Sequence, residues 1–140
     1  MILLDTNVIS ELARFSPEPA VENFLRLQPP ESVFTSAVCE AEIRYGLARL
    51  APGRRREDLT RRVLQFLADA FPGQILPFDS ACAALYGEIR ANREAAGRSI
   101  TVADGMIAAT ARMHGAALAT RNLADFEGSG IELVNPWMAE

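Results

Sequence analysis

The sequence predicts an α/β fold in which a central, mostly parallel β-sheet of about five strands carries helices on both faces. Two observations lead to this fold class. Short apolar runs, which suit buried strands, alternate with longer segments whose apolar residues recur at helical spacing. A capping or turn residue stands at most junctions between these segments. With 140 residues, 49% of them hydrophobic, the chain is expected to form one domain, residues 1–140.

In the first half of the chain, capping residues and prolines define the elements. Asp5 and the two polar residues after it offer caps for a first helix, and Ser36 can cap a later one. Proline pairs and Pro52-Gly53 separate the helices. The expected elements are a strand at 2–4, helices at 8–13 and 20–27, a strand at 32–35, a helix from Ser36 to Leu50 and a helix at 54–70.

In the second half, Asp79 can cap a helix that Gly97 stops, and Thr101 begins the next helix. The segment 120–126 is expected to be a capped turn with Phe126 in the core. The expected elements are a strand at 75–78, helices at 79–96 and 101–114, and strands at 117–119 and 131–134.

The composition excludes several kinds of chemistry. All 14 basic residues are arginines, so a Walker A phosphate loop, a lysine Schiff base and pyridoxal enzymes are ruled out. The single histidine, His114, excludes two-histidine acid–base catalysis and zinc sites built on histidine pairs. Cys39 and Cys82 lie inside helical patterns and are expected to be buried thiols in a reducing compartment. Carboxylates, hydroxyls and arginines remain.

The chain shows no membrane segment and no global positive charge. It has no basic leader before Asp5 and no apolar run near the roughly 20 residues that a membrane helix needs. We therefore expect a cytoplasmic protein that does not contact membranes. The net charge of −4 gives no overall field for binding nucleic acid.

Two acids stand at positions that allow two interpretations each. Asp5 ends the first strand, where parallel sheets present ligand-binding groups, but it can equally cap the following helix. Glu42 falls at the edge of the apolar stripe of its helix. Taken alone, Glu42 is better explained as a structural residue than as a catalytic one.

Asp104 is the most anomalous acid in the sequence. It shares a helix face with Ile107, Ala108 and Ala111, and a carboxylate on such a face is costly unless it is paired or bound to a metal. The alternative is an acid favoured by the helix dipole in the first turn after Thr101. Because no basic residue is spaced to pair with Asp104 on this face, the pattern favours a functional role.

After the fourth strand, Thr120, Asn122 and Asp125 offer further oxygens. Three or four oxygen side chains at the carboxyl edge, without histidine or cysteine ligands, suit Mg²⁺ or Mn²⁺ and do not suit zinc. A metal held in this way can activate water and neutralise a scissile phosphate. The sequence therefore predicts metal-assisted phosphodiester hydrolysis.

Four motifs in series resemble the PIN domain and, within it, the VapC toxins, especially the FitB-like branch. The motifs are ILLDTNVISE at residues 2–11, AEIRYG at 41–46, ITVADGMIAATA at 100–111 and ATRNLADF at 119–126. The resemblance covers essentially the whole chain and implies a PIN-like fold. It also implies a Mg²⁺- or Mn²⁺-dependent endoribonuclease, the toxin of a type II toxin–antitoxin pair.

The resemblance further assigns roles to residues. Asp5, Glu42 and Asp104 match the acids that hold the metal, and Asp125 matches a further family position. Asn122 stands where the family usually has its fourth acid, so the number of ions, one or two, stays open. The remaining matches, together with Asn122, are expected to support the acids through hydrogen bonds; they are Thr6, Asn7 and Thr120.

The resemblance implies three partners: an RNA substrate, a VapB- or FitA-like antitoxin that blocks the site, and a second copy of the chain in a homodimer. Arginines must offset the repulsion between the acids and an RNA backbone, and the best-placed ones are Arg44, Arg98 and Arg121. The denser cluster at 54–56 and 61–62 is better explained as a solvated helix start.

Other functions fit less well. Phosphoaspartate receivers and haloacid-dehalogenase phosphatases also place an aspartate after the first strand, but both need a lysine that this chain lacks. The remaining alternative is a catalytically weak or inactive PIN-like module that binds RNA or a partner. The presence of Asp5, Glu42 and Asp104 favours the nuclease, and a cleavage assay with and without Mg²⁺ separates the two.

Overall fold

The structure of the protein is a computed structural model, which describes residues 1–138; the last two residues of the expected domain, 139 and 140, lie outside the described residues. The strands are β1 (Ile2–Leu4), β2 (Val33–Ser36), β3 (Ile75–Leu76), β4 (Ala117–Ala119) and β5 (Leu133–Val134). The α-helices are α1 (Thr6–Leu12), α2 (Pro19–Arg26), α3 (Ala37–Ala48), α4 (Arg54–Ala70), α5 (Ser80–Ala95), α6 (Val102–Met113) and α7 (Leu123–Phe126), and a 3-10 turn covers Pro30–Ser32.

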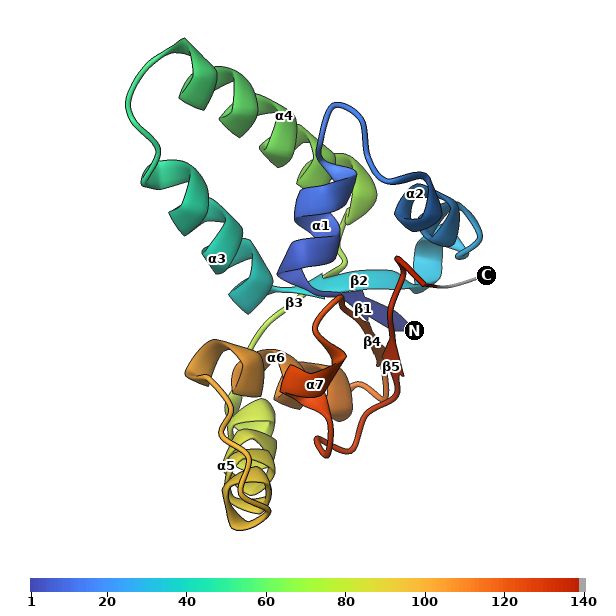
Figure 1. Cartoon of the computed structure of the whole chain (residues 1–140), viewed down its shortest axis with the longest axis vertical. Helices are drawn as coiled ribbons and strands as arrows, with labels where there is room; N and C mark the ends of the chain where they lie inside the picture. The colour runs from blue at the N-terminus through green and yellow to red at the C-terminus, as the bar shows by residue number, and fades with distance from the viewer. Residues whose placement is uncertain (139–140) are drawn as a thin grey trace.

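The five strands form one sheet in the order β3-β2-β1-β4-β5, and every neighbouring pair is parallel. Helices α1 to α4 cover one face of this sheet and α5 to α7 cover the other (Figure 1). The α/β class with helices on both faces is thus confirmed. The direction in which the strands are added reverses beside β1, so a crevice is expected at the carboxyl ends of β1 and β4.

Most element boundaries agree with the capping signals. Ser36, Asp79 and Thr101 accept hydrogen bonds from the first turns of α3, α5 and α6, and Gly97 adopts a φ of +78° after α5. The third strand ends at Leu76, two residues earlier than expected, because Pro77 has no N–H to continue the ladder. The fifth strand is also shorter than expected, at residues 133–134.

The segment after β4 differs from the expected turn. It contains a single helical turn, α7, closed by hydrogen bonds from the backbone N–H of Asp125 to the Asn122 carbonyl and from that of Glu127 to the Leu123 carbonyl. Phe126 is buried beneath this turn, as expected. A helix of four residues is too short to produce a periodic pattern, so the sequence predicted the anchor but not the helix.

The core lies on both sides of β1, whose three residues are all buried. The apolar face of α6, formed by Ile107, Ala108 and Ala111, is fully buried as well. Both thiols, Cys39 and Cys82, are free and buried, which confirms that expectation. Among the described residues, no helix is long and apolar enough to cross a membrane.

Candidate metal centre

Asp5 lies at the centre of the site, at the carboxyl end of β1, and caps the following helix. Its backbone N–H donates to the Ala119 carbonyl of β4 at 2.9 Å, and its Oδ1 accepts from the Thr6 N–H at 2.8 Å, which caps α1. Its Oδ2 accepts from the Thr120 hydroxyl at 2.8 Å. Burial raises the pKa of this carboxyl, although the hydrogen bonds oppose the shift.

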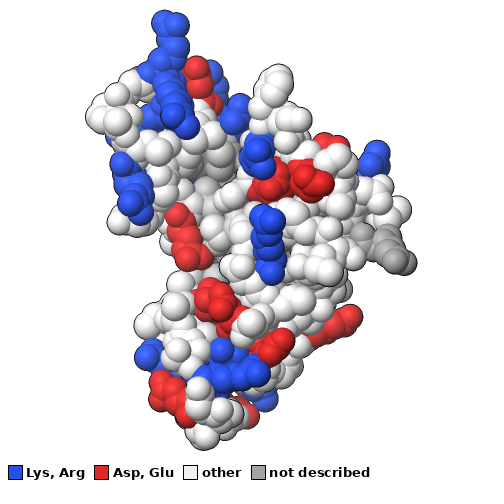
Figure 2. Space-filling view, in the orientation of Figure 1, with Lys and Arg blue, Asp and Glu red and all other residues white. Residues whose placement is uncertain are grey.

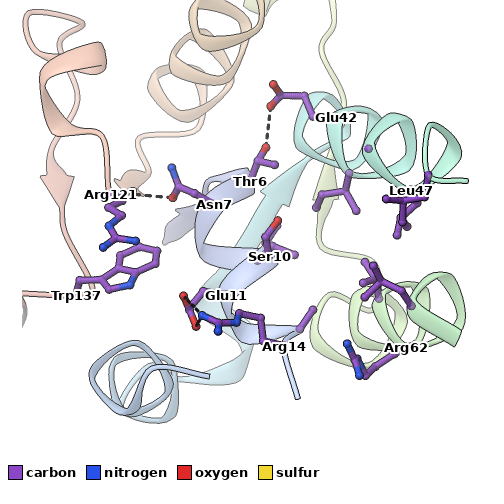
Figure 3. Close-up of a pocket in the computed structure, with 17 residues that line it drawn as sticks. Thr6, Asn7, Ser10, Glu11, Arg14, Glu42, Leu47, Arg62, Arg121 and Trp137 are labelled. Atoms are coloured by element: carbon purple, nitrogen blue, oxygen red, sulfur yellow. Dashed lines mark hydrogen bonds and ion pairs between the residues drawn. The ribbon is translucent and has the colours of Figure 1, made fainter. Parts of the chain in front are cut away.

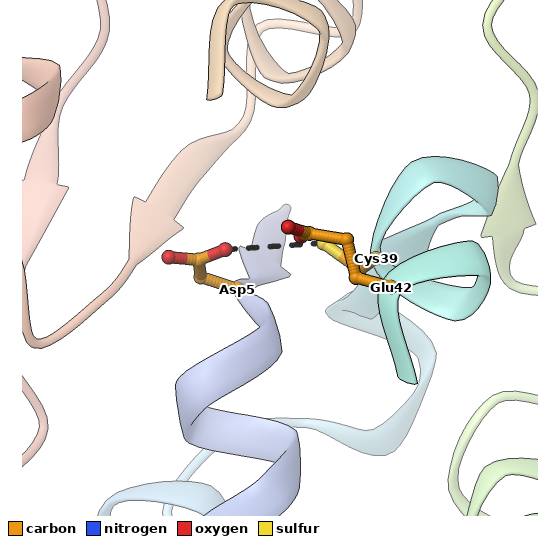
Figure 4. Close-up of side chains that lie close together, drawn as sticks. All are labelled: Asp5, Cys39 and Glu42. Carbon is orange, nitrogen blue, oxygen red and sulfur yellow. Dashed lines mark hydrogen bonds between the residues drawn. The ribbon is translucent and has the colours of Figure 1, made fainter. Parts of the chain in front are cut away.

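Glu42 reaches the same point from α3. Its Oε1 accepts from the Thr6 hydroxyl at 2.7 Å, and a carboxylate oxygen of Glu42, one of Asp5 and the Cys39 sulfur all lie within 4.8 Å of one another (Figure 4). The Glu42 side chain is exposed, whereas Asp5 is buried. The folded chain therefore turns a residue that looked structural in the sequence into part of an acid pair.

The thiol of Cys39 is a neighbour of this pair and not a further anion. Burial, together with the charge of Asp5, raises its pKa to about 11. At neutral pH the thiol stays protonated, and it lies 4.0 Å from Oδ1 of Asp5, in the donor position. Cys39 thus packs beneath the carboxylates without adding charge.

Asp104 lies in the first turn of α6, and its backbone N–H donates to the Thr101 hydroxyl at 3.1 Å. Its side chain is partly buried, and no arginine forms an ion pair with it in residues 1–138. Burial and the charge of Asp5 raise its pKa to about 6, with smaller contributions from Asp125 and Glu42. The helix dipole explains why an acid lies in the first turn of α6. It does not explain why a partly buried carboxylate has no ion-pair partner among the described residues.

Asp125 lies on α7. Its charge raises the pKa of both Asp5 and Asp104, which indicates that it lies close to these acids. Asn122 lies differently. Its backbone N–H donates to the Thr120 hydroxyl at 3.1 Å, and no hydrogen bond joins its exposed side chain to an acid in the described part of the chain. Of the two candidates for the fourth acidic position, Asp125 is therefore the one whose side chain acts on the site.

Three of the expected supporting residues contact the acids. Besides the hydroxyls of Thr6 and Thr120, the Asn7 amide donates to Asp5 Oδ2 at 3.3 Å and to the Thr120 hydroxyl at 3.4 Å. The Asn7 Oδ1 in turn accepts from the Arg121 N–H at 3.2 Å (Figure 3). This network joins the carboxyl ends of β1 and β4 and fixes the orientation of Asp5.

The three expected RNA-contacting arginines lie in different places. Arg44 pairs with Glu40 at 3.1 Å along its own helix, and Arg98 pairs with Glu127 at 2.9 Å. Arg121 instead stacks over the ring of Trp137, 4.9 Å from its centroid, beside the acid site. The structure therefore brings only Arg121 of these three to the lining of the groove described next.

A largely apolar groove of about 620 Å³ opens beside Glu42, between α1, α3 and α4 (Figure 3). Arg14, Arg62 and Arg121 line it together with the ring of Trp137. Sequence reasoning missed Arg14 and Trp137 and interpreted Arg62 as part of a solvated helix start, because only tertiary packing brings α1, α4 and the C-terminal turn to one surface. The signals present in the sequence were the arginine cluster that contains Arg62 and the single tryptophan.

The charge distribution explains what this arrangement can bind. Acidic side chains lie on both sides of the hollow between the α3 and α6 parts of the molecule (Figure 2). Their ligand atoms are oxygens, their charges repel one another, and within residues 1–138 none of these acids forms an ion pair with an arginine. A divalent cation that prefers oxygen ligands fits such a carboxylate-rich site.

Comparisons with known proteins identify the family of the chain. The family model of the PIN domain matches residues 2–127. The chain is 42% identical to the VapC ribonuclease Y4jK of Sinorhizobium fredii, over 98% of each protein. It is 43% identical to the toxin FitB of Neisseria gonorrhoeae, over 98% of this chain and 99% of FitB.

Solved structures give the same result. A structure of FitAB bound to an IR36 DNA fragment contains a chain that superposes with a TM-score of 0.92 and 43% identity, over 100% of this chain and 98% of that one. FitAcB from Neisseria gonorrhoeae superposes with a TM-score of 0.91 and 42% identity, over 99% of this chain and 100% of that one. With fold and sequence in agreement, the chain belongs to the PIN domain family, in the group that contains FitB and this VapC ribonuclease.

Proposed function

We propose that this protein is the toxin of a toxin–antitoxin pair and acts as a metal-dependent endoribonuclease. The observation that carries the proposal is the group of acids at the carboxyl ends of β1 and β4, which forms no ion pair within residues 1–138 and in which the pKa of Asp104 is raised to about 6. The relatives named as ribonucleases and as a toxin support the choice of reaction.

Asp5, Glu42 and Asp104 would hold Mg²⁺ or Mn²⁺, with Asp125 close by. When bound, such an ion supplies positive charge for the scissile phosphate and lowers the pKa of water. The chain's own residues prepare this site: Thr6 orients Glu42, while Asn7 and Thr120 orient Asp5. Arg121 is the proposed phosphate contact, because it lines the groove beside these acids.

The proposal is tested with purified protein freed of its partner. Single-stranded RNA should be cut in Mg²⁺ or Mn²⁺ and should stay intact in EDTA, because the acids alone provide no positive charge for the phosphate. Equal cleavage in EDTA would contradict the metal mechanism. RNA binding without cleavage in either metal would favour the alternative, an inactive PIN-like binding module.

The groove beside Glu42 is the proposed docking surface for the antitoxin. It is largely apolar and leads to the acids, so a partner with an apolar helix and a basic side chain beyond it would fill the groove and neutralise the carboxylates. Structural neighbours are complexes named FitAB and VapBC. The homodimer and the cytoplasmic location expected from the sequence stay predictions.

The fourth acid of the site can be identified by paired substitutions. Asp125→Asn is expected to raise the metal concentration for half-maximal cleavage about tenfold, because it removes a charge that acts on Asp5 and Asp104. Asn122→Ala, the matched control, should change it less than twofold. Asn122→Asp completes the set: a lower metal requirement in this variant would show that residue 122 is within reach of the ion and would contradict the preference for Asp125.

A further inference from the structure

Arg93, on the α5 side of the sheet, has an unusual environment. It lies at the C-terminal end of α5 and is 4% exposed. Within residues 1–138 no carboxylate lies within ion-pair distance of its guanidinium. A buried arginine without a counter-ion is costly, so its hydrogen bonds need an explanation.

The guanidinium of Arg93 donates to two backbone carbonyls from different segments of the chain. Nη2 donates to the Ser99 carbonyl at 2.9 Å, and Nη1 donates to the Glu127 carbonyl. The Nε–H has no hydrogen-bond partner among the described residues. These two hydrogen bonds are therefore the polar contacts of the Arg93 guanidinium. They connect two segments of the chain, at Ser99 and Glu127, that are 28 residues apart.

Each of these segments leads directly to an acid of the metal centre. Ser99 comes two residues before Thr101, whose hydroxyl accepts from the Asp104 N–H and so begins α6. Glu127 follows α7, and its backbone N–H closes that turn on the Leu123 carbonyl. Arg93 therefore connects the start of the Asp104 helix to the end of the Asp125 turn.

We infer that Arg93 is a positioning residue for the metal centre, holding Asp104 and Asp125 at a fixed separation through their supporting segments. This inference rests on the proposed function. The two carboxylates carry charges of the same sign, which repel each other. The hydrogen bonds of Arg93 to both supporting segments oppose this repulsion in the metal-free protein. They hold the two acids in an arrangement that can bind a shared cation. An exposed ion pair, Arg98 with Glu127, joins the same segments at the surface, where solvent weakens it.

The test is direct Mn²⁺ binding, measured from the electron paramagnetic resonance signal of free Mn²⁺ with no RNA present. Arg93→Met keeps the apolar stem and removes both donors, and it should weaken Mn²⁺ binding about tenfold. Arg93→Lys keeps the charge but not the fork of donors, so it should fall between Arg93→Met and the parent. The matched control is Arg90→Met, one turn earlier on α5, where the partly exposed guanidinium bonds, within residues 1–138, only to Tyr86 and Glu94. It should bind Mn²⁺ within twofold of the parent.

Urea unfolding in EDTA establishes that each variant is folded at the start of the titration, so that lost stability is not mistaken for lost positioning. If folded Arg93→Met binds Mn²⁺ as the parent does, Arg93 is only a stabilising residue and the inference is wrong. If Arg93→Met does not fold, Arg93→Lys decides, and parental affinity in that variant overturns the inference. Failure of the parent itself to bind Mn²⁺ would instead overturn the proposed function, and this inference with it.

Discussion

Asp104→Asn is expected to abolish RNA cleavage and to make the metal-free protein more stable. The substitution keeps the shape of the side chain and removes one negative charge from a site that has no compensating cation. The proposed ion would lose a charged ligand, so cleavage and toxicity should both disappear. The same change relieves the repulsion that Asp104 feels from Asp5, Glu42 and Asp125.

The stability gain should depend on pH in a defined direction. Because the pKa of Asp104 is raised from 3.8 to about 6, the folded state binds this proton more tightly than the unfolded state does. Protonation of Asp104 therefore favours the folded state. This contribution to the free energy of unfolding is complete below pH 3.8 and is lost as the pH rises through about 6. This corresponds to at most about 3 kcal/mol, and solvent screening of a partly buried carboxylate reduces it to on the order of 1 kcal/mol.

Thermal unfolding in EDTA measures this gain. At pH 7.5, Asp104→Asn should raise the Tm by about 4 °C, and the difference should shrink as the pH is lowered towards the pKa of the unfolded aspartate. Asp69→Asn is the matched control, because Asp69 is exposed on α4 and an asparagine there can still accept from Gln65. Parental cleavage by Asp104→Asn would remove Asp104 from the metal centre.

Gly46→Trp is expected to separate the toxin from its antitoxin. Gly46 lines the groove on α3, and a Cβ built there meets no atom within 4 Å. A large side chain can therefore enter the groove without disturbing the helix, and it would occupy the space proposed for the partner. Affinity for the antitoxin should fall at least a hundredfold, because the docking surface no longer closes around an apolar helix.

Two measurements check this result: pull-down of the coexpressed antitoxin, and growth of cells that express both proteins. Cells with Gly46→Trp should stop growing although antitoxin is present. Gly46→Ala is the control, since it adds only a methyl group and stabilises the helix by about 0.5–1 kcal/mol; its partner should bind as before. Normal neutralisation of Gly46→Trp would place the antitoxin on another surface.

The sequence predicted what depends on local chemistry. The bounds of α4 and the caps Ser36, Asp79 and Thr101 follow from side chains that act within a few residues of themselves. It also singled out Asp104, because an acid on an apolar helix face is a local anomaly. Local rules did not reveal the short helix α7, whose stability comes from the burial of Phe126.

Sequence proximity was a poor guide to the arginines, and packing explains why. Arg44 is two residues from Glu42 but pairs with Glu40 on another side of α3. Arg121 lies beside the acids because β4 pairs with β1, and Arg62 reaches the groove because α4 lies across from α1. Such placements depend on the order of strands in the sheet, which the alternation of elements left undetermined.

That strand order determines when the site can form as the chain is synthesised. The central strand β1 is made first, yet one of its two neighbours, β4, begins only at Ala117. Asp5 is oriented by Thr120, and Asp125 follows still later. A chain still emerging from the ribosome therefore lacks a complete set of acids until β4 and the turn after it have been translated. The proposed nuclease centre cannot form on a shorter chain, even though the strand that carries Asp5 is already present.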